Sequence, residues 1–164
     1  MSVTAYIALG SNLGDSEAMI REAARALAPL SSDGVQLSSL YHSTPVDCPP
    51  GSPDFINAVV RIKTLQGETP ETLLGKLQAL EKQFGRTKKR VHNEARPLDL
   101  DLLTFGNETR ETPFLTLPHP RAPIRGFVLL PLSELAPELV LPKQTQPVFA
   151  LLRDLPAESL PRRR

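Results

Sequence analysis

The chain has 164 residues, of which 40% are apolar, and its 19 Lys and Arg nearly balance its 18 Asp and Glu. This length and composition predict one domain over residues 1–164, with no overall field that would attract a nucleic acid or a membrane surface. Because the sequence shows no signal-like start, no membrane-length apolar run and no second cysteine to pair with Cys48, we expect a cytoplasmic protein from a reducing compartment.

The spacing of apolar residues, together with capping and turn residues, predicts the elements along the chain. In chain order they are a strand at 3–9, a turn at 10–14, a helix from Asp15 or Ser16 to Leu30, strands at 35–41 and 55–62, a helix from Thr69 to Gly85, strands at 98–105 and 114–117, and a helix at 127–135.

This order predicts an α+β fold, a ferredoxin-like split β-α-β sandwich whose mainly antiparallel sheet has helices packed on it. The strands at 35–41 and 55–62 are expected to pair as antiparallel neighbours. The chain has 17 prolines, and the stretches 44–53, 113–123 and 131–161 that hold most of them are expected to be stiff loops. Residues 143–164 are expected to form a C-terminal extension with a short helix and a solvated basic tail.

Two aspartates alternate with leucines in Leu98-Asp99-Leu100-Asp101. Residues at i and i+2 of a strand share a face, so the carboxylates project together, roughly 7 Å apart, while the leucines face the core. Mg²⁺ takes one or two protein carboxylates and completes its shell with water and substrate phosphates. The pair therefore predicts a magnesium site at Asp99 and Asp101. The pattern alone also fits the wet face of an exposed strand, although aspartate is a poor strand former.

A basic segment precedes this pair, with five Lys and Arg against the single acid Glu94 in residues 86–96. Phosphoryl transfer depends on positioning and on neutralising charge, so a metal on one side and cations on the other favour an enzyme that moves phosphate from ATP. His119 and Arg125, in a proline-rich loop, can add phosphate contacts. The turn at 10–14 lacks the Gly-Lys-Ser/Thr ending of a P-loop.

Other interpretations of the basic segment and the acidic pair stay open at this point. The segment can be a solvated loop, or part of an RNA-binding module on the same fold, although it holds no Phe, Tyr or Trp to stack bases. A nucleotidyltransferase would use the same paired acids to transfer AMP and would release pyrophosphate.

Short motifs in a fixed order resemble the family of 6-hydroxymethyl-7,8-dihydropterin pyrophosphokinases over about residues 3–142. They are Ala8-Leu9-Gly10-Ser11-Asn12-Leu13-Gly14, Tyr41 to Pro45, Phe55-Ile56-Asn57-Ala58, Arg96-Pro97-Leu98-Asp99-Leu100-Asp101, Pro118-His119 and Arg125-Gly126-Phe127. The resemblance implies that the chain transfers pyrophosphate from ATP to the hydroxymethyl group of the pterin, leaving AMP, in folate biosynthesis. It further implies ATP and hydroxymethyldihydropterin as small-molecule partners. We expect a monomeric or weakly associated protein.

The resemblance also implies roles for particular residues. Asp99 and Asp101 would hold two Mg²⁺ ions, with Arg86 and Arg96 as further catalytic residues. The pterin would meet Asn57 at its edge, Phe55 and Phe127 on its faces, and backbone near Ser43, Thr44 and Val46. ATP would meet Gln78, Glu81, Lys88, Arg96, His119 and Arg125, and backbone near Leu102 and Thr116.

Two of these residues have ordinary alternatives: Phe127 can be a core residue and Glu81 a surface ion-pair partner. The chain also departs from many relatives at His92-Asn93-Glu94-Ala95, where it carries no tryptophan.

Overall fold

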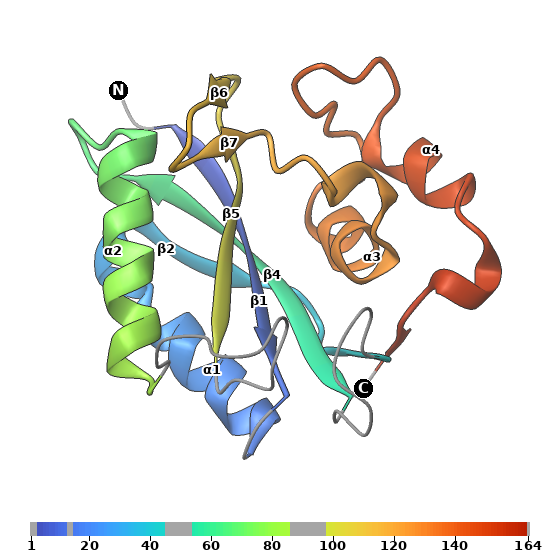
Figure 1. The fold of residues 1–164 in the computed structure, drawn as a ribbon, viewed down its shortest axis with the longest axis horizontal. Helices are drawn as coiled ribbons and strands as arrows, with labels where there is room; N and C mark the ends of the chain where they lie inside the picture. Colours follow the sequence, from blue (N-terminus) through green and yellow to red (C-terminus); the bar gives the residue numbers. More distant parts are fainter. Residues whose placement is uncertain (1–2, 13–14, 45–53, 86–97, 164) are drawn as a thin grey trace.

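The computed structural model describes residues 3–12, 15–44, 54–85 and 98–163, and shows one sheet between two layers of helices (Figure 1). The strands are β1 (Thr4–Ser11), β2 (Ser31–Leu37), β3 (Tyr41–Ser43), β4 (Phe55–Thr64), β5 (Asp99–Phe105), β6 (Arg110–Glu111), β7 (Thr116–Leu117) and β8 (Arg162–Arg163). The helices are α1 (Ser16–Ala26), α2 (Pro70–Gln83), α3 (Gly126–Leu135) and α4 (Val148–Arg153), with short 3₁₀ turns η1 (Ala28–Leu30), η2 (Ala122–Ile124) and η3 (Ala157–Ser159).

The main sheet has the strand order β5-β1-β4-β3-β8, and β2 also pairs with β4. All of its described pairings are antiparallel. Strands β1 and β2, which α1 connects, lie on opposite sides of β4, as in a split β-α-β unit. The predicted α+β, ferredoxin-like plan and the antiparallel pairing of β2 with β4 are therefore confirmed.

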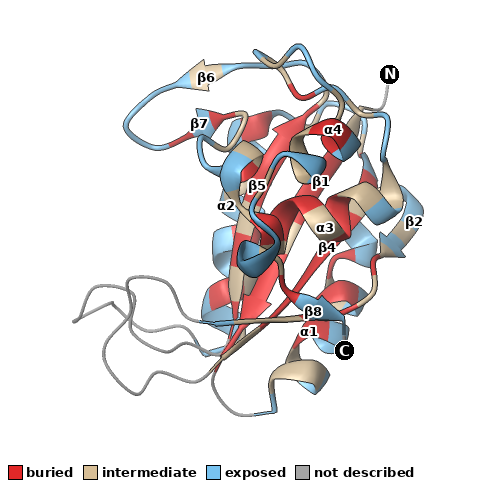
Figure 2. Ribbon diagram, turned by 90° about the vertical axis from the view of Figure 1, so that its right-hand side faces the viewer, coloured by how far each residue is buried: buried red, intermediate tan, exposed pale blue. Residues whose placement is uncertain are grey.

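Two hydrophobic cores lie on the two faces of the sheet. Helices α1 and α2 cover one face, where Ile20 of α1, Leu73 of α2 and Ile7 of β1 belong to one hydrophobic cluster. Helices α3 and α4 cover the other face, where Leu129 of α3, Val148 of α4 and Leu103 of β5 belong to a second cluster. Figure 2 shows the central strands buried between these layers. Because both faces are covered, the apolar side chains of the central strands are buried on either side of the sheet.

The helix starts follow from local sequence. Asp15 caps α1 by accepting a hydrogen bond from the Ala18 N–H at 3.2 Å. Thr69 and Thr72 form a reciprocal capping box at the start of α2, where Pro70 needs no donor. Helix α1 ends at Ala26 rather than at the expected Leu30, since Pro29 lacks an N–H and disfavours helical geometry before it.

The expected strand at 35–41 is two strands, β2 and β3, with a break at residues 38–40. Ser38 causes the break. Its N–H donates to the Val59 carbonyl, and its Oγ accepts from the Val59 N–H, both at 3.0 Å. The hydroxyl thus replaces a backbone carbonyl in the ladder, so the next residue does not continue the regular pairing.

Three other predictions differ from the structure. Strand β1 runs on to Ser11, so Gly10 and Ser11 are strand residues, not part of a turn. The strand expected at 114–117 is reduced to Thr116–Leu117, which pairs with β6. The prolines of 131–161 do not exclude helix, since Pro131 lies inside α3 and α4 follows Pro147.

The basic C-terminus is not a free tail over the residues described. Arg162 and Arg163 keep exposed side chains, but their backbone forms β8, which pairs with His42 and Tyr41 of β3. Sequence reasoning missed this strand because two arginines at a chain end carry no β-pattern. Within the described ranges, no helix combines the length and apolar character that crossing a membrane requires.

Candidate functional site

One row of cross-strand neighbours brings Asp99, Gly10 and Asn57 together on the α3 face of the sheet. Gly10 of β1 pairs with Asp99 of β5 on one side and with Asn57 of β4 on the other. Neighbouring strands lie about 4.8 Å apart, so Asp99 and Asn57 are about 10 Å apart across the row. The residues expected at the metal and at the pterin edge thus lie two strands apart on one rigid surface.

Gly10 forms the floor of the site between Asp99 and Asn57, because it has no side chain to fill this space. A Cβ built at Gly10 would lie 3.4 Å from Asn57 Nδ2 and 3.6 Å from Phe55 Cδ1, where the glycine leaves space. Sequence reasoning placed Gly10 in a turn and so missed it as a site residue. The signal was its alternation with Tyr6 and Ala8, which continues the same face of the strand.

Asp99 and Asp101 are half-buried on β5, while Leu100 between them is 5% exposed in the core beneath α1 and α2. This alternation confirms the predicted placement of the two carboxylates on one face. Among the described residues, no group of three or more His, Cys, Asp or Glu is arranged to hold a metal. A cation bound to the described part of the chain at this place would therefore take its protein ligands from the two aspartates.

His119 is fixed to the outer edge of β5. Its N–H donates to the Leu103 carbonyl at 2.9 Å, and its Nδ1 accepts from the Arg121 N–H at 3.2 Å. Because the Nδ1 lone pair is used as an acceptor, the ring proton lies on Nε2, which makes Nε2 a donor. A neutral imidazole with a directed N–H suits a phosphate or nucleotide oxygen.

The same side chains share one electrostatic field. Burial, then Arg125 and Arg121, holds the pKa of His119 below its usual 6.5, with Asp99 acting in the opposite direction. Burial and then Arg121 lower the pKa of Arg125, while Asp101 and Asp99 oppose this. The field thus couples the aspartates on β5 with Arg125 at the start of α3 and His119 in the preceding loop.

Of the expected pterin residues, Asn57 and Phe55 lie at the other end of the row, with Ser43 beside them on β3. The Ser43 hydroxyl donates to Asn57 Oδ1, which fixes the orientation of this buried amide. Phe55 pairs with Ser43 at the start of β4 and is half-buried. Phe127 lies in the first turn of α3, half-buried, with the Arg125 guanidinium carbon 5.3 Å from its ring centre. Phe127 therefore packs against the core beneath α3 and stays partly exposed.

Glu81 approaches the site strand from α2, on the other layer. It is only 7% exposed, and its carboxylate accepts from the Leu100 N–H at 2.7 Å. The carboxylate is therefore buried, and not at the surface where the alternative from sequence puts it. Gln78, three residues earlier, is exposed, while Leu102 is buried and Thr116 is exposed on β7 beside β5.

Thr44 is exposed just after β3. The remaining predicted site residues, Arg86, Lys88, Arg96 and Val46, lie outside the described residues.

Comparisons with known proteins point to one family. Residues 6–137 match the model of 7,8-dihydro-6-hydroxymethylpterin-pyrophosphokinase (HPPK). A Haemophilus influenzae protein named 2-amino-4-hydroxy-6-hydroxymethyldihydropteridine pyrophosphokinase is 44% identical over 141 residues, covering 85% of this chain and 86% of its own. The folic acid synthesis protein fol1 of Pneumocystis carinii is 37% identical over 84% of this chain and 18% of its own.

Among solved structures, wild-type HPPK-DHPS of Plasmodium falciparum with pteroate is similar, with a TM-score of 0.73 and 15% identity. The match covers 93% of this chain, which spans 42% of that longer chain. At this identity the likeness shows the fold.

Glu81 generates a prediction for stability. Glu81→Ala leaves the Leu100 N–H without its partner, so the free energy of unfolding, measured by urea titration, should fall by about 1–3 kcal/mol. Glu81→Gln retains an acceptor oxygen and should lose less. Exposed Gln78→Ala, on the same helix, should change it by less than about 0.5 kcal/mol. Equal losses in Glu81→Ala and Gln78→Ala would contradict the structural role of Glu81.

His119 generates a prediction for titration. In the metal-free protein its NMR midpoint should lie below 6.5, with its resonance identified by its loss in His119→Asn. Because the unfolded chain then binds more protons between the two pKa values, this group lowers the free energy of unfolding as pH falls through that window. A midpoint at or above 6.5 would show that burial and the neighbouring arginines do not govern it.

Proposed function

The chain belongs to the 7,8-dihydro-6-hydroxymethylpterin-pyrophosphokinase family, and we propose that it transfers pyrophosphate from ATP to 6-hydroxymethyl-7,8-dihydropterin in folate biosynthesis. In this reaction the pterin hydroxyl oxygen forms a bond to the β-phosphorus of ATP. The bond between that phosphorus and the oxygen bridging to the α-phosphate breaks, and AMP leaves. The hydroxyl proton is lost as the pterin diphosphate forms.

The observation that carries the proposal is the row Asn57–Gly10–Asp99. The row holds a fixed amide, an open floor and an acidic strand in this order, which supports binding of the pterin at Asn57 and of the ATP phosphates near Asp99. His119 is bonded to the edge of β5, and both His119 and Arg125 interact electrostatically with Asp99, which supports assigning the two residues to the phosphates. The row is common to both substrates, so the fold itself sets their alignment.

The two carboxylates fit Mg²⁺, since they are hard oxygen donors on one face of a rigid strand. We assign two Mg²⁺ ions to Asp99 and Asp101, which would share them with the phosphates of ATP. When bound, Mg²⁺ supplies positive charge that offsets the charge of the phosphates. Both aspartates are half-buried on β5, so the sheet rather than a loop defines the positions of their carboxylates.

The chain's own side chains divide the remaining work. Asn57, oriented by Ser43, reads the polar edge of the pterin, and Phe55 and Phe127 meet its faces. Arg125 and the Nε2–H of His119 bind phosphate oxygens, where fixed donors lower the cost of developing charge. Glu81 holds the strand that bears both aspartates.

The resemblance of the motif from Arg96 to Asp101 supports assigning Arg86, Lys88 and Arg96 to the phosphates of ATP as well, and Val46 to the pterin. For ATP, Gln78, Thr116 and the backbone of Leu102 are assigned on the same ground. The single cysteine supports a reducing compartment such as the cytoplasm, and the monomer stays a prediction.

The reaction itself is tested by incubating the protein with ATP, MgCl₂ and 6-hydroxymethyl-7,8-dihydropterin and separating the products. AMP and the pterin diphosphate should appear in equal amounts, and omission of either the pterin or Mg²⁺ should stop AMP release. Release of inorganic pyrophosphate instead would identify a nucleotidyltransferase and overturn the proposal.

The aspartates are tested by substitution. Asp99→Ala and Asp101→Ala should each lower kcat/KM for ATP by at least about a hundredfold, because a charge that balances the transition state is lost. Circular dichroism should show both variants folded. Asp33→Ala removes an exposed strand carboxylate away from the row and serves as the matched control. Near-normal turnover in either site variant would remove its metal role.

A further inference from the structure

The C-terminal segment 156–163 touches both walls of the proposed pterin pocket. One wall is the first turn of α3, which carries Phe127, and the other is strand β3, which carries Ser43. In Figure 1 this segment descends from α4 and ends beside β3, at the same end of the sheet as the pocket row. A short stretch of chain therefore bridges two elements that are far apart in sequence.

The contact with α3 is made through Gly126. A Cβ built at Gly126 would lie 2.7 Å from the Ser159 carbonyl oxygen and 3.1 Å from Leu160 Cδ2. Real Cβ atoms do not approach an oxygen so closely, so glycine is required here by space. Gly126 stands between Arg125 and Phe127, and any shift of its backbone moves both neighbours.

The contact with the other wall is made through β8. Arg163 pairs with Tyr41 and Arg162 with His42, so β8 covers the side of β3 that faces away from β4. On its inner side β3 pairs with β4, placing Tyr41 opposite Asn57. β8 thus supports the strand whose Ser43 orients the Asn57 amide.

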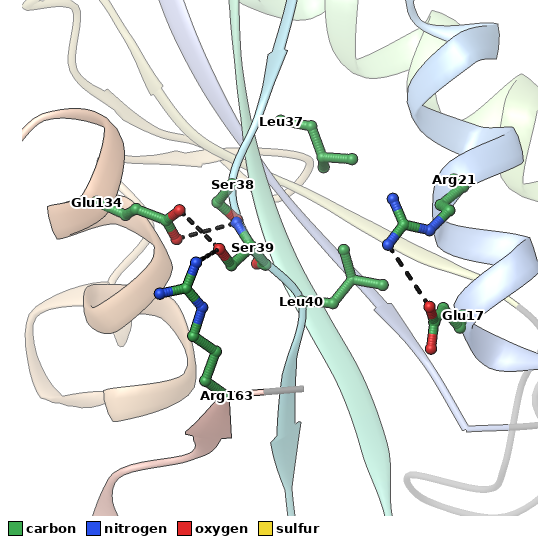
Figure 3. Close-up of a pocket in the computed structure, with 8 residues that line it drawn as sticks. All are labelled: Glu17, Arg21, Leu37, Ser38, Ser39, Leu40, Glu134 and Arg163. Atoms are coloured by element: carbon green, nitrogen blue, oxygen red, sulfur yellow. Dashed lines mark hydrogen bonds and ion pairs between the residues drawn. The ribbon is translucent and has the colours of Figure 1, made fainter.

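A hydrogen-bond chain closes the bridge at the far end of α3. Arg163 Nη2 donates to Ser39 Oγ at 2.7 Å, and Ser39 donates to the Glu134 carboxylate from its N–H at 2.9 Å and its hydroxyl at 2.8 Å (Figure 3). The Tyr41 hydroxyl also donates to Glu134 at 3.1 Å. Segment 156–163 is therefore tied to α3 at both ends of the helix and to β3 between them.

We propose that segment 156–163 is a strap that sets the separation of the two pterin-binding walls, and that Gly126 is a positioning residue through which the strap places Phe127 and Arg125. The inference rests on the proposed function and extends it to residues that do not touch the substrates. A fixed separation matters because a flat ring is held well only when its two faces and its edge are met together.

Gly126→Ala is the direct test, since the added methyl must displace either the strap or the start of α3. We expect kcat/KM for the pterin to fall about ten- to hundredfold, which is the order of magnitude that a small misplacement of a substrate costs. The affinity for 6-hydroxymethylpterin without ATP should fall in parallel, read from the ligand's own fluorescence in this tryptophan-free chain. Gly75→Ala in α2, where a Cβ meets nothing within 4 Å, is the matched control and should change neither.

A second variant lacking residues 156–164 separates positioning from packing. Its loss of pterin affinity should equal or exceed that of Gly126→Ala, and combining the two changes should add little, because both act through one contact. Full pterin affinity in the folded Gly126→Ala protein, or additive losses in the double variant, would overturn the inference while leaving the proposed function intact. A wild-type protein that neither binds the pterin nor releases AMP would overturn both.

Discussion

The antiparallel pairing of β5 with β1 is the constraint on which the site depends. It fixes the register that puts Asp99 beside Gly10, and it leaves β5 at the edge of the sheet over the described residues. Backbone groups on that edge bond to side-chain and main-chain partners from other elements. The Leu100 N–H is taken by Glu81 of α2, and the Leu103 carbonyl is taken by the His119 N–H. The edge of the sheet thus becomes an attachment point for two residues of the site.

The two faces of the sheet have different roles. The face under α1 and α2 is packed with apolar side chains and holds β5 from behind. The face under α3 holds the second apolar cluster, and Asp99, Asp101 and Asn57 lie on this same face of the sheet. Arg125 stands at this boundary, where the burial that lowers its pKa and the aspartates that oppose this act on the same guanidinium.

The opposite edge of the sheet is managed in a similar way. The β3 edge is covered by β8. In the break between β2 and β3, the Ser39 N–H donates a hydrogen bond to Glu134 of α3. At both edges, strands are therefore bonded to residues from other parts of the chain. The row of Asn57, Gly10 and Asp99 lies between these two edges. A site assembled from sheet register has less freedom to shift than one built from loops alone.

The sequence by itself determined the central strands β1, β4 and β5, the two long helices and the shared face of Asp99 and Asp101, because these follow from local periodicity and capping. Its motifs also determined the family. Only the tertiary structure decided that Gly10 is floor rather than turn, that Glu81 is buried against Leu100, and that the terminal arginines form a strand. Each of these depends on a partner at least 19 residues away, which a local pattern does not detect. Strand pairing and the approach of a helix to a sheet edge are set by packing of the whole sheet.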